Sequence, residues 1–418
     1  MEYIRALWFR IFPAMRLRNF QLFAYGQIIS WSGNWLQTAA IGWQVKTELH
    51  GSAWQVGFAA ALPQLSAAAL AFFAGSITDR FDERRLIYGT QFIQMIQAFA
   101  LGYLTLRHEI TLGWIYGLSL ILGITNALDR PTTHTLLMKI TDRKRLRSGQ
   151  AMNAAILMAG ASIGGLAASI LIPSVGLGGA YVANGISFLP VFWTLWKMEL
   201  QPVNKKTEEN PFTAIWAGWR YLWNEQAILS LILLNGIVVV IGFSYRAIFP
   251  IVTTDLFHGG SKVNGYLYAA VGIGALAGTM LVSSSEDKLI KEDATFRGFI
   301  ITGPLMVGVG LLLFLVTEPS LLFALPFLAL SGAGVVIATS TLRGSIQHHA
   351  PDKMRGRVMG FIFTIFLGGV SVGSWLGGLL AGYIGAGQTL FLVGISSIAI
   401  SLFLFFKRKT GFGSIAKT

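Results

Sequence analysis

The stretch MELQPVNKKTEENPF, residues 198–212, is the most polar segment in the middle of the chain. Long apolar segments lie on both sides of it, and they divide into two sets of equal number. We therefore interpret residues 198–225 as a linker between two halves, residues 20–197 and 226–406. In the second part of the linker, Asn210 is placed as a helix cap and Pro211 at the first helical position, and apolar residues then recur every three or four positions. This spacing predicts an amphipathic helix.

The composition of the whole chain is that of a membrane protein. Of 418 residues, 54% are hydrophobic and only 12% are charged, whereas a soluble protein carries roughly a quarter charged residues. A membrane-spanning helix needs about 20 apolar residues. We expect an all-α membrane protein with twelve transmembrane helices in two pseudo-symmetric six-helix bundles, at residues 20–46, 53–78, 86–106, 112–138, 149–172, 179–197, 226–251, 262–284, 298–317, 320–342, 358–383 and 387–406.

Basic residues predict the orientation of these spans. Most of the 32 lysines and arginines fall in the loops and ends that twelve spans place on one side, which the positive-inside rule makes cytoplasmic. We expect both termini there, with residues 1–19 as an interfacial segment and 407–418 as a tail. The net charge of +13 is explained by this topology and by attraction to anionic lipid, so no nucleic-acid partner is expected.

The two halves share similar sequence motifs, and several motifs of the chain resemble those of a known family. TDRKRLRSGQAM after the fourth span is similar to PDKMRGRVMG after the tenth. The stretch AGSITDRFDERR, residues 74–85, resembles the signature loop of the major facilitator superfamily. Together with WSGNWLQTAAIGW (31–43), ALDRPTTHTLL and IFPIVTTDLF (248–257), it resembles the branch of bacterial exporters that includes enterobactin and macrolide efflux proteins.

The resemblance implies alternating access and a cytoplasmic gate. Weak repeat symmetry across a linker is how many secondary transporters are built, with the substrate site between the halves. By resemblance, polar contacts close the cytoplasmic side, and we assign this gating to Gly75, Asp79, Arg80, Arg84 and Arg85, with Arg355 and Arg357 near the partner span. One departure concerns the antiporter pattern of the fifth span, which here reads GASIGG with Ala161 where the family often has Pro.

The stretch NALDRPTTHTLL, residues 126–137, places ionisable groups inside a span. Such residues are costly in a membrane unless they are paired or face water, so they are candidate functional residues. We expect Asp129 to face the central cavity and exchange protons, while Arg130 stabilises its charge or meets an anionic substrate group. The alternative is a buried structural pair that fixes this span to a neighbour. His134 is a further candidate for proton coupling, with a hydrogen-bonded histidine at the span end as its alternative.

The first span carries a polar stripe without charge. Gln27, Asn34 and Gln37 fall with Ser30 and Gln44 within an arc of about 100° on a helix. A substrate-facing role is expected, with interhelical hydrogen bonding as the alternative. Arg246, near the outer end of the seventh span, is assigned either to an anionic ligand or to the lipid headgroups.

These features together predict a secondary transporter. We expect proton-coupled export of a mid-sized amphiphilic compound, a siderophore or a drug, by a monomer in the bacterial inner membrane. Import, lipid flipping and a non-transporting receptor are the alternatives. No P-loop or zinc-protease motif is present in the sequence, and no enzyme activity, metal or cofactor is expected. The expected partners are the small-molecule substrate, protons and membrane lipids.

Overall fold

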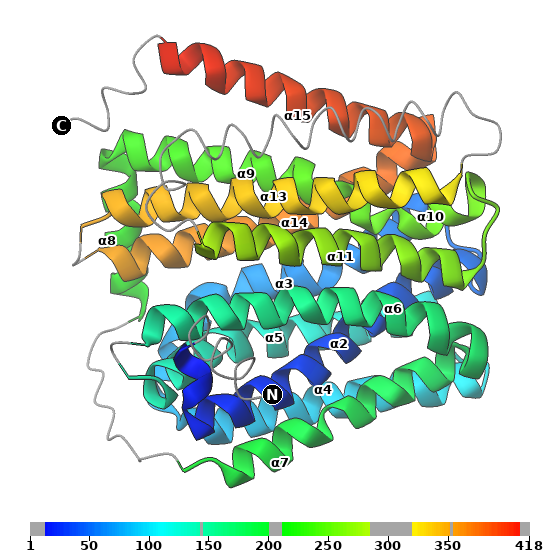
Figure 1. The fold of residues 1–418 in the computed structure, drawn as a ribbon, viewed down its shortest axis with the longest axis horizontal. Coiled ribbons are helices and arrows are strands. Elements are labelled where there is room, and N and C mark those ends of the chain that lie inside the picture. The colour runs from blue at the N-terminus through cyan, green and yellow to red at the C-terminus, as the bar shows by residue number, and fades with distance from the viewer. Residues whose placement is uncertain (1–12, 143–144, 200–210, 285–319, 352–353, 410–418) are drawn as a thin grey trace, which may run out of the picture.

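The computed structural model describes residues 13–142, 145–199, 211–284, 320–351 and 354–409. Within these residues the chain forms helices and no strands. Figure 1 shows the long helices lying roughly side by side along one direction. After a short 3-10 helix at Pro13–Arg16, they are α2 (Arg18–Thr47), α3 (Ala53–Arg80), α4 (Glu83–Leu106), α5 (Leu112–Ile140), α6 (Leu146–Ser187), α7 (Leu189–Lys197), α8 (Pro211–Asn224), α9 (Gln226–Ala247), α10 (Phe249–Asp255), α11 (Ser261–Ser284), α13 (Leu321–His349), α14 (Arg355–Ile384) and α15 (Ala386–Lys409).

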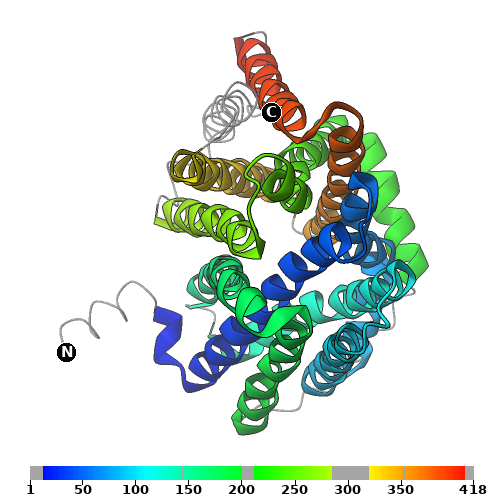
Figure 2. The same ribbon diagram turned by 90° about the vertical axis from the view of Figure 1, so that its right-hand side faces the viewer.

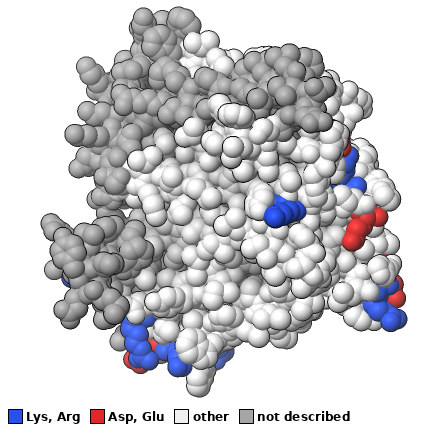
Figure 3. Space-filling model, turned by 45° about the vertical axis from the view of Figure 1, so that its right-hand side comes forward, with Lys and Arg blue, Asp and Glu red and all other residues white. Residues whose placement is uncertain are grey.

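Seven stretches of the described residues are long and apolar enough to cross a membrane. The expected span at 298–317 lies outside the described residues, as do the segment 1–12 and most of the linker, 200–210. The exact count of twelve and the predicted boundaries of the two bundles therefore stay predictions. On the face in Figure 3, charged side chains of the described residues lie mainly near the lower and right edges, and the broad middle is almost uncharged. That distribution fits a belt in contact with lipid.

Local sequence signals account for where several helices begin and turn. The side chain of Asp82 accepts a hydrogen bond from the backbone N–H of Arg85 at the start of α4, and Thr111 caps α5 in the same way. The range of α6 contains two helices that meet at a sharp kink at Gly176, whose φ is 72° and which lies between the predicted fifth and sixth spans. A glycine takes this left-handed conformation without strain. The structure has a helix, α8, at the position where the linker was predicted to form an amphipathic one, and its amphipathic character stays a prediction.

Viewed along the helices, Figure 2 shows α2 to α7 grouped on one side and α9 to α15 on the other. The two groups, called here the N and C bundles, meet where α6 packs along α11 and α3 packs along α14. A Cβ added to Gly165 would lie 2.4 Å from the backbone nitrogen of Ala269, and one added to Gly57 would lie 2.6 Å from the carbonyl oxygen of Ser374. The absence of side chains at these points therefore lets the backbones touch.

A cluster of buried apolar residues spans both bundles at the end predicted to be outside. It includes Leu36 and Val45 of α2 together with Phe249 and Val252 of α10 and Leu267 of α11. The structure is therefore closed at this end, and the bundles enclose a cavity beneath the closure.

Candidate functional site

The cavity lies between the two bundles and is lined by both. Its walls come from α2, α3 and α5 of the N bundle and from α9, α11 and α14 of the C bundle. Its empty volume is about 1020 Å³, counting the part open to solvent. Because part of this space is open solvent, the residues that line the cavity, rather than its volume, indicate what it could hold.

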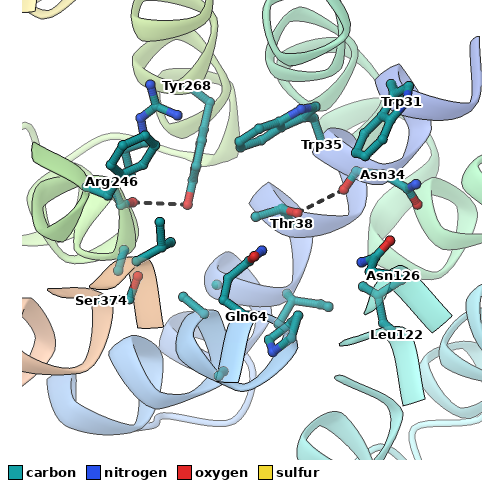
Figure 4. A pocket seen from close by; sticks show the side chains of 18 of the residues that line it. Trp31, Asn34, Trp35, Thr38, Gln64, Leu122, Asn126, Arg246, Tyr268 and Ser374 are labelled. Carbon is teal, nitrogen blue, oxygen red and sulfur yellow. Dashed lines mark hydrogen bonds between the residues drawn. The ribbon is translucent and has the colours of Figure 1, made fainter. Parts of the chain in front are cut away.

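Aromatic and polar side chains share the cavity wall (Figure 4). Arg246 and Tyr268 lie on one side and Asn34 and Asn126 on the other, with Trp35 between them. The Tyr268 hydroxyl donates a hydrogen bond of 3.2 Å to the backbone oxygen of Arg246. The full lining is Trp31, Asn34, Trp35, Thr38, Ile41, Gly42, Ala59, Ala60, Pro63, Gln64, Leu122, Asn126, Arg130, Phe243, Arg246, Ala247, Tyr268, Val370 and Ser374.

Both predicted arginines belong to this wall, and each contacts a ring from the opposite bundle. The Arg130 guanidinium lies 5.8 Å from the ring centre of Trp31 and 5.8 Å from that of Phe363 on α14. The Arg246 guanidinium lies 4.9 Å from Phe243 and 5.9 Å from Trp35 on α2. The headgroup-anchor alternative for Arg246 does not fit this position, because its side chain points into the protein.

Asp129 differs from the expectation that it faces the cavity. It is 3% exposed and is turned toward α4, where Thr90 donates a hydrogen bond of 2.9 Å to its carboxylate and Gln91 donates one of 3.2 Å. Adjacent helix residues point about 100° apart. With Arg130 on the cavity wall, Asp129 therefore meets the neighbouring helix. Asp129 and Arg130 thus occupy separate surroundings on the same turn of α5.

The polar stripe of the first span also differs from the expectation, with one exception. Gln37 is fully buried and bonds Gln97 of α4 and Asn184 of α6, while Ser30 donates to Gln91. Gln44 bonds Thr105 and Tyr181, and Gln27 is buried as well. Asn34, at the edge of the stripe, lines the cavity. Most of the stripe therefore serves interhelical hydrogen bonding, which was the alternative interpretation.

The remaining predicted residues lie away from the cavity or outside the described side chains. His134 is exposed near the end of α5, and it is not among the lining residues. Arg84 donates a hydrogen bond of 2.7 Å to the backbone oxygen of Trp196 within the N bundle, and Arg85 is exposed. The side-chain positions at Gly75, Asp79, Arg80, Arg355 and Arg357 fall outside the described part of the structure, so the gating assignment stays a prediction.

Three residues of interest were missed from sequence. Asn126 lies four residues before Arg130, so it shares the face of α5 that lines the cavity, and that spacing was available as a signal. Gln91 belongs to a row with Gln94 and Gln97 on α4, a polar repeat inside a predicted span. Arg343 lies one residue beyond the predicted span 320–342, but α13 continues to His349, and the Arg343 guanidinium lies 4.1 Å from the Phe366 ring centre.

An ion pair ties the two bundles at the closed end. The Lys46 ammonium lies 3.1 Å from the Asp255 carboxylate, with side chains 24% and 49% exposed. A pair of this exposure contributes up to about 1 kcal/mol. The pair is specific to the closed arrangement, because it joins α2 to α10.

Loss of this pair is expected to open the outer end modestly. In Asp255→Asn we expect a cysteine introduced at Thr38, on the cavity wall, to react roughly two- to fivefold faster with an impermeant thiol reagent added outside. The protein has no cysteine of its own, so the label reports one position. Glu109→Gln is the matched control, since Glu109 pairs with Arg107 on its own bundle. Equal labelling in both variants would show that the pair does not hold the closure.

Known proteins share both the sequence and the fold. Residues 11–412 match the family described as transmembrane secretion effector. The chain is 22% identical to the staphyloferrin A transporter of Staphylococcus aureus, with 90% of this chain and 93% of the relative covered. It is 26% identical to the enterobactin exporter EntS of Salmonella typhi, with 81% and 80% covered.

Solved structures agree in fold at low identity. A bacterial homologue of the human lysosomal transporter Spinster, inward-facing and occupied, aligns with a TM-score of 0.69 and 13% identity over 93% of this chain and 96% of the other. The POT family transporter PepTSo aligns with a TM-score of 0.70 and 12% identity, covering 94% and 98%. The family match covers nearly the whole chain, and the solved structures share its fold. The chain therefore belongs to the transmembrane secretion effector family; it is an integral membrane transporter of the major facilitator fold and not an enzyme.

Proposed function

We propose that this transporter exports a siderophore-like small molecule from the cytoplasm and couples the export to protons. The observation that carries the proposal is the cavity lined by α2, α3 and α5 of one bundle and by α9, α11 and α14 of the other. Only a site shared by both bundles is exposed to alternate sides when the bundles rock. The two relatives described above support the substrate class. They align with this chain over 93% and 80% of their own length, and they are named for staphyloferrin A and enterobactin.

The proposed cycle assigns roles to the two ends of the molecule. The outer end, closed here by apolar packing and the Lys46–Asp255 pair, opens for release. The signature loop at residues 74–85, with Arg355 and Arg357 opposite, then closes the cytoplasmic end. Both termini are cytoplasmic in this scheme, the membrane is the bacterial inner membrane, and the working unit is a monomer. Asp129 carries the proton, assisted by Arg130 and His134.

Inverted membrane vesicles test the proposal directly. With the interior acidified and a fluorescent pH probe inside, a panel of siderophores is added; we expect one of them to release protons through the native protein. Asn126→Trp fills the cavity and should abolish that release. Ile124→Trp is the matched control, because Ile124 lies on the same helix with 43% of its surface exposed on the outer side of the bundle. If no compound releases protons, or if Asn126→Trp transports normally, the proposal is wrong.

A further inference from the structure

Two unpaired arginines define the charge of the cavity. Among the described residues that line it, Arg130 and Arg246 are the charged ones. Neither takes part in an ion pair among the described residues, and the Arg130 Nε and the Arg246 Nε and Nη2 atoms are buried without a hydrogen-bond partner. The nearest acid in sequence, Asp129, is engaged by Thr90 and Gln91 on the other side of α5. Buried guanidinium donors without partners are costly, and within the described part of the structure the two arginines have no acidic partner.

Arg343 adds a third positive charge close to the cavity. Its guanidinium lies over Phe366, and it is near enough to Arg130 for the two charges to repel. The Phe366 ring packs edge-on against the Phe243 ring, with 5.4 Å between the ring centres. The Arg246 guanidinium in turn lies 4.9 Å from the Phe243 ring centre. A row of arginines and aromatic rings therefore runs from α13 across α14 and α9 to the cavity wall. Such a row draws anions toward the cavity and repels cations.

The two cavity arginines offer two separate positions for acidic groups. The Arg130 guanidinium lies 5.8 Å from the Trp31 ring centre and the Arg246 guanidinium 5.9 Å from that of Trp35, and these tryptophans are one turn apart on α2. A guanidinium binds a carboxylate through two parallel hydrogen bonds. The tryptophan faces between the arginines offer an apolar surface to the body of the same ligand. The two arginines stand on opposite bundles and line the same cavity, so a ligand that binds both would bridge the bundles.

We propose that the cavity binds an amphiphilic polyanion, with one carboxylate-like group on Arg130, a second on Arg246 and its apolar body on Trp31 and Trp35. This inference rests on the proposed function for its biological meaning, but binding itself needs no gradient and no transport. A bound anion neutralises the like charges that the two bundles contribute to the same cavity. It therefore also stabilises the closed arrangement.

Calorimetric titration of the purified full chain tests the proposal with small probes. We expect terephthalate, an aromatic dicarboxylate, to bind roughly tenfold more tightly than benzoate, which has one carboxylate. Tetraphenylphosphonium, a cation of similar apolar character, should not bind in the cavity. The affinity for terephthalate should fall as salt is raised, because salt screens charge pairs that are open to solvent.

Variants locate the site and separate charge from geometry. Arg246→Gln and Arg130→Gln should each reduce the affinity for terephthalate to the level of benzoate. Arg246→Lys should retain part of the affinity, because lysine keeps the positive charge but lacks the planar guanidinium group. Arg107→Gln, at a surface arginine outside the cavity, should bind like the native protein. If Arg130→Gln does not fold, Arg246→Gln and its lysine counterpart decide the question.

The outcomes distinguish this inference from the proposed function. Tighter binding of the cation than of the dicarboxylate, or dicarboxylate binding that survives both glutamine variants, overturns the anion site. Anion binding at the arginines without any transport in vesicles overturns the export proposal and leaves the site intact. Transport that is unchanged in Arg246→Gln leaves export intact and overturns the anion site.

Discussion

Gly165→Ala is expected to reduce transport by roughly five- to 150-fold. The added Cβ would lie 2.4 Å from the backbone nitrogen and 2.8 Å from the Cα of Ala269. Backbone atoms of α11 cannot rotate away as a side chain can, so α6 and α11 must separate. Overpacking of this kind costs about 1–3 kcal/mol, which corresponds to a five- to 150-fold loss of the closed arrangement. The cycle passes through this arrangement, so the rate should fall with its population.

The matched control is Gly117→Ala, because a Cβ at Gly117 meets nothing within 4 Å. Its transport rate should equal that of the native protein. A cysteine at Thr38 supplies an independent readout: in Gly165→Ala it should react faster with the outside reagent, and in Gly117→Ala it should not. Native transport by a folded Gly165→Ala protein would contradict the view that the bundles pack this closely during transport.

The helices could be predicted from the sequence, but the direction of individual side chains could not. Length, apolar character and the distribution of basic residues predict α5, α9 or α13 as spans, because each requirement acts on a whole helix. Asp129 shows the limit. Its depth in the membrane follows from position in the chain, but its contact with Thr90 and Gln91 depends on the rotation of α5 against α4, which periodicity does not determine in a helix that is apolar on all sides.

The glycines of GASIGG illustrate the same point. Sequence similarity suggests an antiporter motif, whereas the structure assigns different neighbours to its members. Gly160 and Gly164 lie against Trp31 and Trp35 of α2 within the N bundle, and Gly165 lies against Ala269 across the bundle interface. A substitution at each would therefore test a different contact. The pattern indicates close helix approach, but the partner helix becomes known only from the packing.

The charge of the proposed ligand bears on the direction of transport. Moving one elementary charge across a potential of 100 mV changes its free energy by about 2.3 kcal/mol. The bacterial cytoplasm is electrically negative relative to the outside, so the free energy of an anion falls by this amount when it leaves. For a dianion the fall is twice as large. Export of a polyanion held by Arg130 and Arg246 is therefore favoured by the membrane potential even before protons are counted. Proton coupling would add to this driving force through a separate group.

Asp129→Asn is expected to remove the dependence of transport on the pH gradient. The Asp129 carboxylate is the buried acidic group of α5, and asparagine has nearly the same shape but does not ionise. Gln91 can rotate its amide and keep a hydrogen bond to the new side chain, so the contact between α4 and α5 should persist. If one proton is exchanged per cycle, each pH unit across the membrane raises the ratio of substrate concentrations that the native protein maintains by about tenfold. In the variant the pH gradient should not raise this ratio, and the variant should still carry substrate down its own gradient.

Asp142→Asn is the control for this experiment, because Asp142 follows the end of the same helix and its ion pair with Arg145 is 47% exposed at the carboxylate. It should retain the full response to pH. Both variants are reconstituted in vesicles with and without a pH gradient, and substrate accumulation is measured at equal membrane potential. If Asp129→Asn still accumulates substrate about tenfold per pH unit, the carboxylate is a structural tie between α4 and α5. The proton site would then have to be sought elsewhere, while the cavity and its arginines would keep their proposed role.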